Sequence, residues 1–172
     1  MPFTPLHFGP GVFAKGVSPR QFSLTAFVAA NVAIDLEPLY HLVRGDYPIH
    51  GPLHTFVGAT TAGVLAGASI PALIGLVRRI PLLDAQLAKL PLAIRSEFSL
   101  FAAILGGSVG GASHPLLDSL VHSDVFPFAP WSSSNPFLGA VDPDALFNSL
   151  LAAGGLGLIL FLLRAIQFKR AG

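Results

Sequence analysis

The sequence has no cysteine and is poor in charged residues. Its 172 residues include 10 Lys and Arg and 9 Asp and Glu, so charged residues make up only 11%, whereas soluble domains contain about 25%. So few charges cannot form a solvated surface, and most of the exterior must face lipid. The lack of cysteine excludes a disulfide framework. A formal net charge of +1 provides no basic face for nucleic acid, so no nucleic-acid partner is expected.

Charge is missing above all from four long apolar runs. Hydrophobic residues make up 52% of the chain, the mean hydropathy is +0.68, and a transmembrane helix needs about 20 mostly apolar residues. The runs are Phe22–Ile34, which extends through Leu39; Thr55–Val77; Phe98–Ser113, which continues towards Val121; and Ala145–Leu163. They predict an all-α fold, a polytopic membrane helix bundle with four spanning helices, formed by residues 1–172 as a single integral membrane domain.

The N-terminal segment lacks the basic residues and the cleavage site of a signal peptide. Leu6–Val17 is too short to span a membrane, and we expect it to form a short helix that packs against the next one. The glycines of this segment would allow close helix contact; they are Gly9, Gly11 and Gly16.

Basic residues are distributed unevenly between the connections. Lys15 and Arg20 flank the first connection, and further basic residues crowd the Pro81–Pro91 segment and the C-terminal tail, whereas Ser123–Asp144 has no Lys or Arg. The positive-inside rule therefore predicts that the first turn, the central loop and the C-terminus are cytoplasmic.

On this topology, ionisable residues of four separate segments fall near the outer membrane face. A rise of 1.5 Å per residue places Asp35 about 22 Å from Arg20, and His7 about 16 Å from Ser18. The other members of this group are His50, His54, His114, Asp118 and His122. An ionisable residue left uncompensated within a membrane costs at least about 2.5–3.5 kcal/mol, so these side chains predict a functional site.

The spacing of these residues favours a metal site. His50 and His54 are four residues apart and are expected to share a helix face, and His114, Asp118 and His122 form one stripe at i, i+4 and i+8. Imidazole and carboxylate ligands together favour zinc or a similar transition metal over calcium. The expected cofactor is therefore a divalent metal, most simply zinc, as one or more ions.

Other polar residues have simpler explanations. Asn31 lies one turn before Asp35 and is expected to orient it. Pro38 indicates that the chain leaves the helix there, which makes Glu37 a solvated partner of Arg44. An interfacial position is expected for His41 and Trp131, tight helix packing for the Gly106-Gly107 and Gly110-Gly111 pairs, solvation or capping for Asp46, Asp124 and Asp142, and an N-cap role for Asp144.

Several short motifs point to a known family. They are Thr4-Pro5-Leu6-His7, Asp35-Leu36-Glu37, His50-Gly51-Pro52-Leu53-His54-Thr55, Ser113-His114-Pro115-Leu116-Leu117-Asp118 and Pro127-Phe128-Ala129-Pro130-Trp131. Together they resemble the membrane-bound metal-dependent hydrolases, a large prokaryotic family that is still mostly of unknown function. That family is thought to be distantly related to zinc-dependent phospholipase C and the P1-type nucleases, helical phosphodiesterases that hold several zinc ions. The resemblance implies a multi-pass protein of the prokaryotic plasma (inner) membrane.

Carried over residue by residue, the resemblance implies six metal ligands: His7, Asp35, His50, His54, His114 and Asp118. Two features depart from the family pattern. His50 and His54 are one residue closer than in the usual His-Arg-Gly-x-Thr-His element, which leaves open whether both bind the same ion. The usual Pro-Asp-x-Asp is Ile34-Asp35-Leu36-Glu37 here, so Glu37 stands where the family has a second Asp.

The leading hypothesis is a membrane-embedded metal-dependent hydrolase that cleaves a phosphoester. The substrate would be a membrane lipid or a small molecule. Asp35 and Asp118 are the candidate catalytic carboxylates, as bridging ligands or general base. Candidates for supporting or substrate-side roles are Asn31, Glu37, His122, Trp131 and Asn135.

Three alternatives remain open from the sequence. The first is a membrane protein that binds or transports a metal without chemistry. The second is a haem bundle with His54 and His114 as axial ligands. The third is a purely structural metal site in a protein that binds partners.

Overall fold

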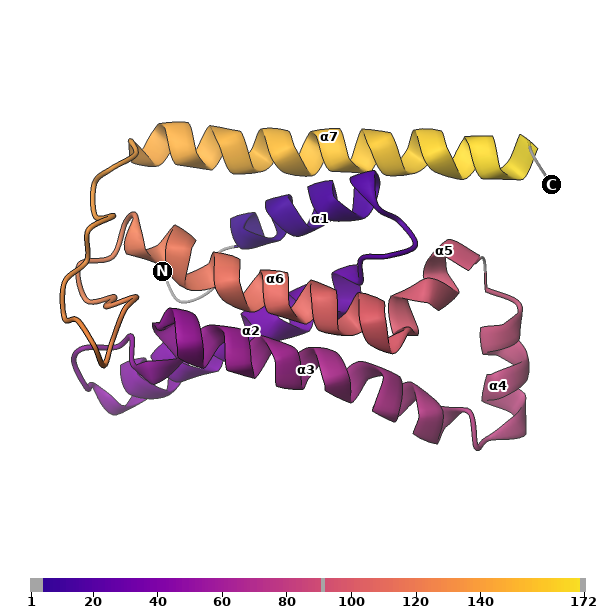
Figure 1. The fold of residues 1–172 in the computed structure, drawn as a ribbon, viewed down its shortest axis with the longest axis horizontal. Helices are drawn as coiled ribbons and strands as arrows, with labels where there is room; N and C mark the ends of the chain where they lie inside the picture. Colours follow the sequence, from indigo (N-terminus) through magenta and orange to yellow (C-terminus); the bar gives the residue numbers. More distant parts are fainter. Residues whose placement is uncertain (1–4, 91, 171–172) are drawn as a thin grey trace.

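A computed structural model describes residues 5–90 and 92–170, and all regular structure in that part of the chain is helical (Figure 1). Thr4 of the first family motif and Pro91 of the central segment lie outside the described residues. The elements in chain order are η1 (Pro5–His7), α1 (Phe8–Val17), α2 (Leu24–Arg44), η2 (Pro52–His54), α3 (Phe56–Val77), α4 (Pro81–Ala88), α5 (Leu92–Arg95), η3 (Ser96–Phe98), α6 (Leu100–Ser119) and α7 (Pro143–Arg170).

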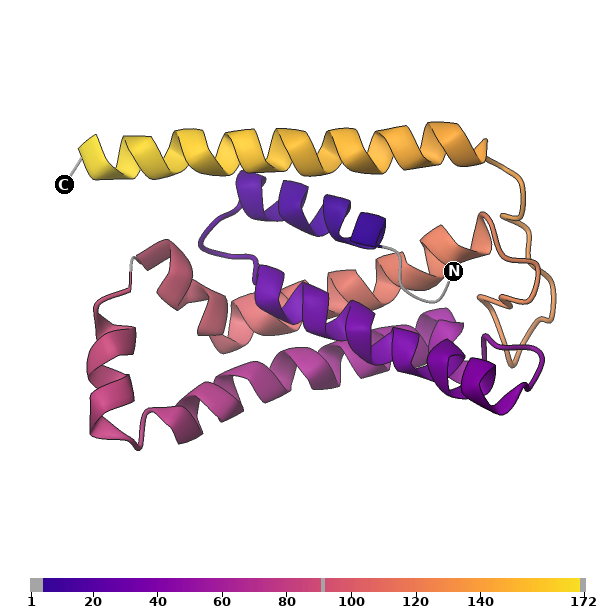
Figure 2. The same cartoon turned by 180° about the vertical axis from the view of Figure 1, so that it is seen from behind.

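Four of these helices are long and apolar enough to cross a membrane: α2, α3, α6 and the Pro143–Gln167 part of α7. The predicted polytopic helix bundle is thereby confirmed, and its helices fit a multi-pass membrane protein. Their directions alternate along the chain, so that the starts of α3 and α7 and the ends of α2 and α6 lie at one end of the bundle (Figures 1 and 2).

The helix α2 is longer than the sequence predicted. It continues through the buried Pro38 and ends at Arg44, where Gly45 adopts a left-handed conformation (φ 71°) and its amide donates to the carbonyls of His41 and Leu42. A membrane helix tolerates an internal proline when neighbouring elements pack around it. The expectation that the chain leaves the helix at Pro38 was wrong.

The central helix α6 uses its glycines to approach two neighbours at once. A Cβ atom on Gly106 would meet the carbonyl of Ser23 before α2, and a Cβ on Gly107 would meet the carbonyl of Gly63 in α3. One turn later, Gly110 lies against Phe27 of α2 and Gly111 against the backbone of α3. The four glycines therefore form two i, i+4 pairs, one for each neighbouring helix, which confirms the predicted tight packing.

The short helix α1 packs mainly against α7 and only weakly against α2. Its glycines Gly9 and Gly16 lie against the backbone of α7 at Leu150 and Gly157, while Gly11 faces the ring of Phe27. The expectation of a short packed helix is confirmed, but its main partner is the last helix of the chain rather than the next one.

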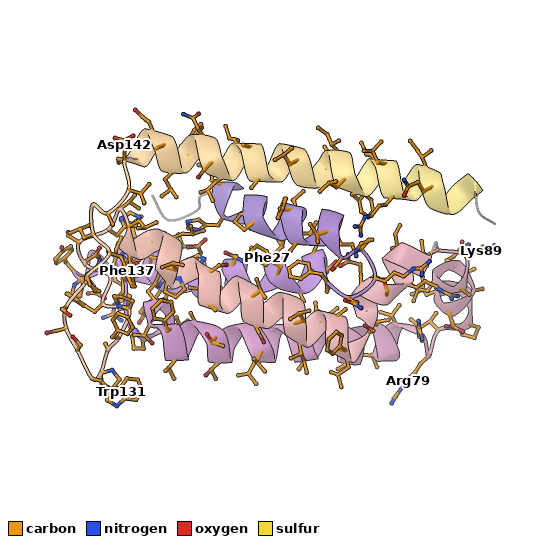
Figure 3. The ribbon with its side chains drawn as sticks, turned by 45° about the horizontal axis from the view of Figure 1, so that its top comes forward. Phe27, Arg79, Lys89, Trp131, Phe137 and Asp142 are labelled. Atoms are coloured by element: carbon orange, nitrogen blue, oxygen red, sulfur yellow. The ribbon has the colours of Figure 1, made fainter. Side chains whose placement is uncertain are left out.

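The two ends of the bundle differ in composition. Arg79 and Lys89 lie at the end that carries α4, and Trp131, Phe137 and Asp142 lie at the opposite end (Figure 3). Asp142 accepts hydrogen bonds from the amides of Asp144 and Ala145, so Asp142 rather than the predicted Asp144 caps α7.

Lys15, in the last turn of α1, is buried. It is 5% exposed, forms an ion pair with Glu97 and donates to the carbonyls of Pro19 and Phe22. Glu97 also accepts a hydrogen bond from Ser23. This buried pair ties the end of α1 to the segment that precedes α6.

Candidate metal centre

Four buried side chains from three elements meet at the end of the bundle opposite α4. They are Asp35 of α2, His54 of η2, and His114 and Asp118 of α6, and one potential ligand atom from each lies within 4.8 Å of the others. Nε2 of His114 lies 3.1 Å from Oδ2 of Asp118 and 3.4 Å from Oδ1 of Asp35. Nε2 of His54 lies 3.4 Å from the same Oδ2 of Asp118.

These separations suit ligands that share one ion. With metal–ligand bonds of about 2.0–2.1 Å, a tetrahedral zinc site separates its ligand atoms by about 3.3 Å. Among the described residues, the Nε2 atoms of His54 and His114 are buried without a hydrogen-bond partner. A buried polar atom left unpaired costs about 1–3 kcal/mol, and a cation between these atoms would satisfy both nitrogens.

Asn31 determines the orientation of His114. Its side-chain amide donates to the carbonyl of Phe27 (2.8 Å), so its oxygen faces Nδ1 of His114 at 2.9 Å as an acceptor. The His114 proton therefore sits on Nδ1, and the lone pair of Nε2 points towards the carboxylates. Metal-binding histidines characteristically donate their second nitrogen to such a partner. Asn31 orients His114, and not Asp35 as the sequence suggested.

Glu37 has the same role for His54. Its carboxylate lies 3.0 Å from Nδ1 of His54 and also accepts hydrogen bonds from the amides of Gly51 and Leu53. Glu37 thereby joins α2 to η2 and leaves Nε2 of His54 for the centre. The expected pairing with Arg44 was wrong, because the guanidinium of Arg44 pairs with Asp46 instead.

The carboxylates make this pocket favourable for positive charge. Burial alone would lower the pKa of His54, but Asp118 and Glu37 on either side of its ring outweigh burial and raise it. A proton or a metal ion is stabilised at this position for the same electrostatic reason.

His7 completes one wall of the centre. Its Nε2 lies 3.3 Å from Oδ1 of Asp118, and its ring contacts that of His114 at a centroid distance of 4.7 Å. Its Nδ1 is buried with no hydrogen-bond partner among the described residues. Burial lowers the pKa of His7, so the imidazole is neutral and able to bind a metal.

His50 belongs to a second, adjacent group with His122 and Asp124. The rings of His50 and His54 are 4.6 Å apart, yet His50 lies before η2 and the two do not share a helix face. His122 likewise lies beyond the end of α6, so the predicted i, i+8 stripe holds only for His114 and Asp118.

Asp124 is the residue that sequence reasoning missed. It was expected to be solvated or to cap a helix, but it is 8% exposed and accepts from Nδ1 of His50 at 2.9 Å and from the amide of Ile49 at 3.2 Å. Burial raises the pKa of Asp124, but these hydrogen bonds and His50 lower it below its usual value. Its place two residues after His122, in a loop with no basic residue, was the available signal.

The remaining candidates lie away from the centre. Trp131 is 77% exposed and lies at the edge of the molecule (Figure 3). Asn135 donates to the backbone carbonyls of Ser119 and His122 and holds the loop after α6 against the helix end. His41 lies near Asp46 on the surface, in agreement with its simpler explanation.

Comparisons with protein-family models, curated proteins and solved structures found no match to this chain. What the structure establishes is a buried His/Asp group that could hold a metal ion, in a helical bundle with four potential membrane spans.

Proposed function

We propose that this protein is a membrane-embedded, metal-dependent hydrolase that cleaves a phosphoester. The observation that carries the proposal is the convergence of two buried imidazole nitrogens on the carboxylates of Asp35 and Asp118. Neither nitrogen has a hydrogen-bond partner in the part of the chain that the structure describes. The resemblance of the motifs around these residues to membrane-bound metal-dependent hydrolases supports the same conclusion.

The two carboxylates differ in their surroundings, which suggests different roles. Asp118 lies within 3.4 Å of three imidazoles, those of His7, His54 and His114, and would act as the central ligand. Asp35 lies 3.4 Å from the imidazole of His114, at the edge of the group, and would accept the proton of the attacking water. A bound zinc ion would supply polarisation of the phosphoryl oxygen and a more acidic water.

The supporting residues fix this arrangement before substrate binds. Asn31 and Glu37 hold the rings of His114 and His54 by their Nδ1 atoms, so little reorganisation is required during reaction. A haem between His54 and His114 is not compatible with this geometry, because their rings are in edge contact with centroids 5.1 Å apart.

The experiment is to purify the protein without chelators, measure its metal content, and assay cleavage of phosphodiesters and phospholipids. Asp35→Asn should retain metal and lose turnover by at least about 100-fold, the scale of general-base catalysis. His41→Ala, which changes a partly exposed histidine outside the centre, should leave metal content and turnover unchanged. Undiminished turnover in metal-free protein would reject the proposal.

A membrane protein that binds or transports the metal is the alternative. Metal uptake into sealed vesicles that contain the purified protein, without cleavage of any phosphoester, would favour it over a hydrolase.

A further inference from the structure

A cavity of 130 Å³ lies directly beside the candidate metal centre, between the end of α6 and the start of α7. Three of the described lining side chains are titratable, namely His7, Asp118 and His122, and the other described ones are apolar, including Leu117 of α6 and Leu146 of α7. The cavity therefore has a polar floor formed by the centre and apolar walls formed by two potential membrane spans.

Among the described residues before α1, Leu6 and His7 of η1 border this space. The helix α7 packs mainly against α1, and α1 begins only at Phe8, so it does not extend between the last turn of α6 and the first turns of α7 (Figures 1 and 2). Val121 and Phe147 remain 41% and 47% exposed at this opening. In a membrane, the opening would face the acyl chains and headgroups of one leaflet.

The floor of the cavity has a hydrogen-bonding atom to offer. His7 lines the cavity and is only 7% exposed, and its Nδ1 has no hydrogen-bond partner among the described residues. With the proton on Nδ1, His7 can donate to a phosphoryl oxygen, while the lone pair of Nε2 would bind the ion shared with Asp118.

We infer that this cavity takes up a membrane lipid with a phosphoester headgroup, which enters sideways between α6 and α7. The headgroup lies against His7 and His122, and an alkyl chain leaves along Leu146 and Val121 into the bilayer. This inference rests on the proposed function and names its substrate class. A water-soluble substrate would have to pass apolar walls to reach the same floor.

A larger cavity is the rival binding site. It has a volume of 550 Å³, lies at the start of α3, and is lined by His50, Phe126 and Ala129 among others. Its walls are mostly apolar. Of the residues in the metal centre and in the adjacent His50 group, only His50 lines this cavity. The cavity at α7 is preferred because Asp118 of the metal centre lines it.

The test is photo-crosslinking in phosphatidylcholine vesicles that contain a little phosphatidylglycerol with a diazirine in one acyl chain. Labelled residues are identified by mass spectrometry. Leu150 lines the cavity and is only 8% exposed, whereas its neighbour Leu151 is 51% exposed. We expect label on Leu150 and Leu146 that disappears in Leu146→Trp and persists in Leu151→Trp and Ala129→Trp.

Label confined to Leu151, or label at Ala129 that only Ala129→Trp removes, would overturn the inference. Val121→Trp fills the cavity from the turn after α6. It replaces Leu146→Trp if the Leu146→Trp variant does not fold, which its metal content reveals. Crosslinking does not require turnover. Label on Leu150 without phosphoester cleavage would contradict the proposed function alone, and phospholipid cleavage without label on Leu150 would contradict the entry route alone.

Discussion

Asn31 decides which nitrogen of His114 carries the proton, and this gives the first prediction. Asn31→Leu keeps a similar volume but removes the acceptor at 2.9 Å from Nδ1. Loss of such a partner typically weakens metal affinity by about 10–100-fold. We expect this loss in chelator-competition titrations with zinc. Asn148→Leu, at an exposed position on α7, is the matched control, and equal affinities in both variants would contradict the assigned role of Asn31.

At the same scale, the sequence identified most of the side chains that meet but not their partners. His114 and Asp118 could be paired from the helical i, i+4 spacing, because that spacing holds wherever a helix forms. The contacts of His114 with Asn31 and of His50 with Asp124 join residues 83 and 74 positions apart. Such contacts depend on how α2, α6 and the loops pack, which no local pattern encodes.

At the scale of elements, the contact between α3 and α6 depends on backbone proximity at Gly63 and Gly107. Gly107→Ala places a methyl group against the carbonyl of Gly63. We expect overpacking to lower the free energy of unfolding by about 1–3 kcal/mol, measured by unfolding in mixed detergent micelles.

Gly75, also on α3, has no atom of the described residues within 4 Å of the position that a Cβ would take. Gly75→Ala should therefore raise helix stability by about 0.5–1 kcal/mol. Destabilisation by Gly75→Ala, or none by Gly107→Ala, would refute this account of the helix contact.

The link between α1 and the segment before α6 gives a second prediction at this scale. Lys15→Met leaves the carboxylate of Glu97 buried without its ion-pair partner. Breaking one side of a buried pair costs about 3–5 kcal/mol, and Lys15→Met combined with Glu97→Gln should recover much of that loss. The same detergent unfolding assay measures both variants. A double variant as unstable as Lys15→Met alone would show that the ion pair is not the cause.

Sequence reasoning succeeded for elements whose signal is local and failed where tertiary contacts decide. The four spans follow from uncharged apolar runs, and the two glycine pairs of α6 follow from their spacing. The partner of α1 did not follow, because α1 and α7 stand at opposite ends of the chain. The same is true of Pro38, since its tolerance within α2 depends on the packing around it.

At the scale of the whole molecule, the asymmetry between the two ends predicts an orientation. We expect the centre to face the outer side of a prokaryotic plasma membrane, because the Lys- and Arg-free loop lies at its end and Arg79 and Lys89 lie at the other (Figure 3). The chain has no cysteine, so in a single-cysteine variant only the introduced thiol can react with a maleimide. Ser133→Cys should react with an impermeant maleimide on intact cells, and Gln86→Cys only after permeabilisation. The reverse pattern would invert the orientation.

The whole account depends on a metal ion held by residues of η2 and α6 beside Asp35 of α2. Elemental analysis of the purified wild type beside His114→Ala tests this most directly. The arrangement of Asp35, His54, His114 and Asp118 predicts at least about one tightly bound ion per chain in the wild type, most simply zinc, and loss of most of it in His114→Ala. The account would be contradicted if wild-type protein from zinc-supplemented cells contained no metal. It would also be contradicted if His114→Ala contained as much metal as the wild type.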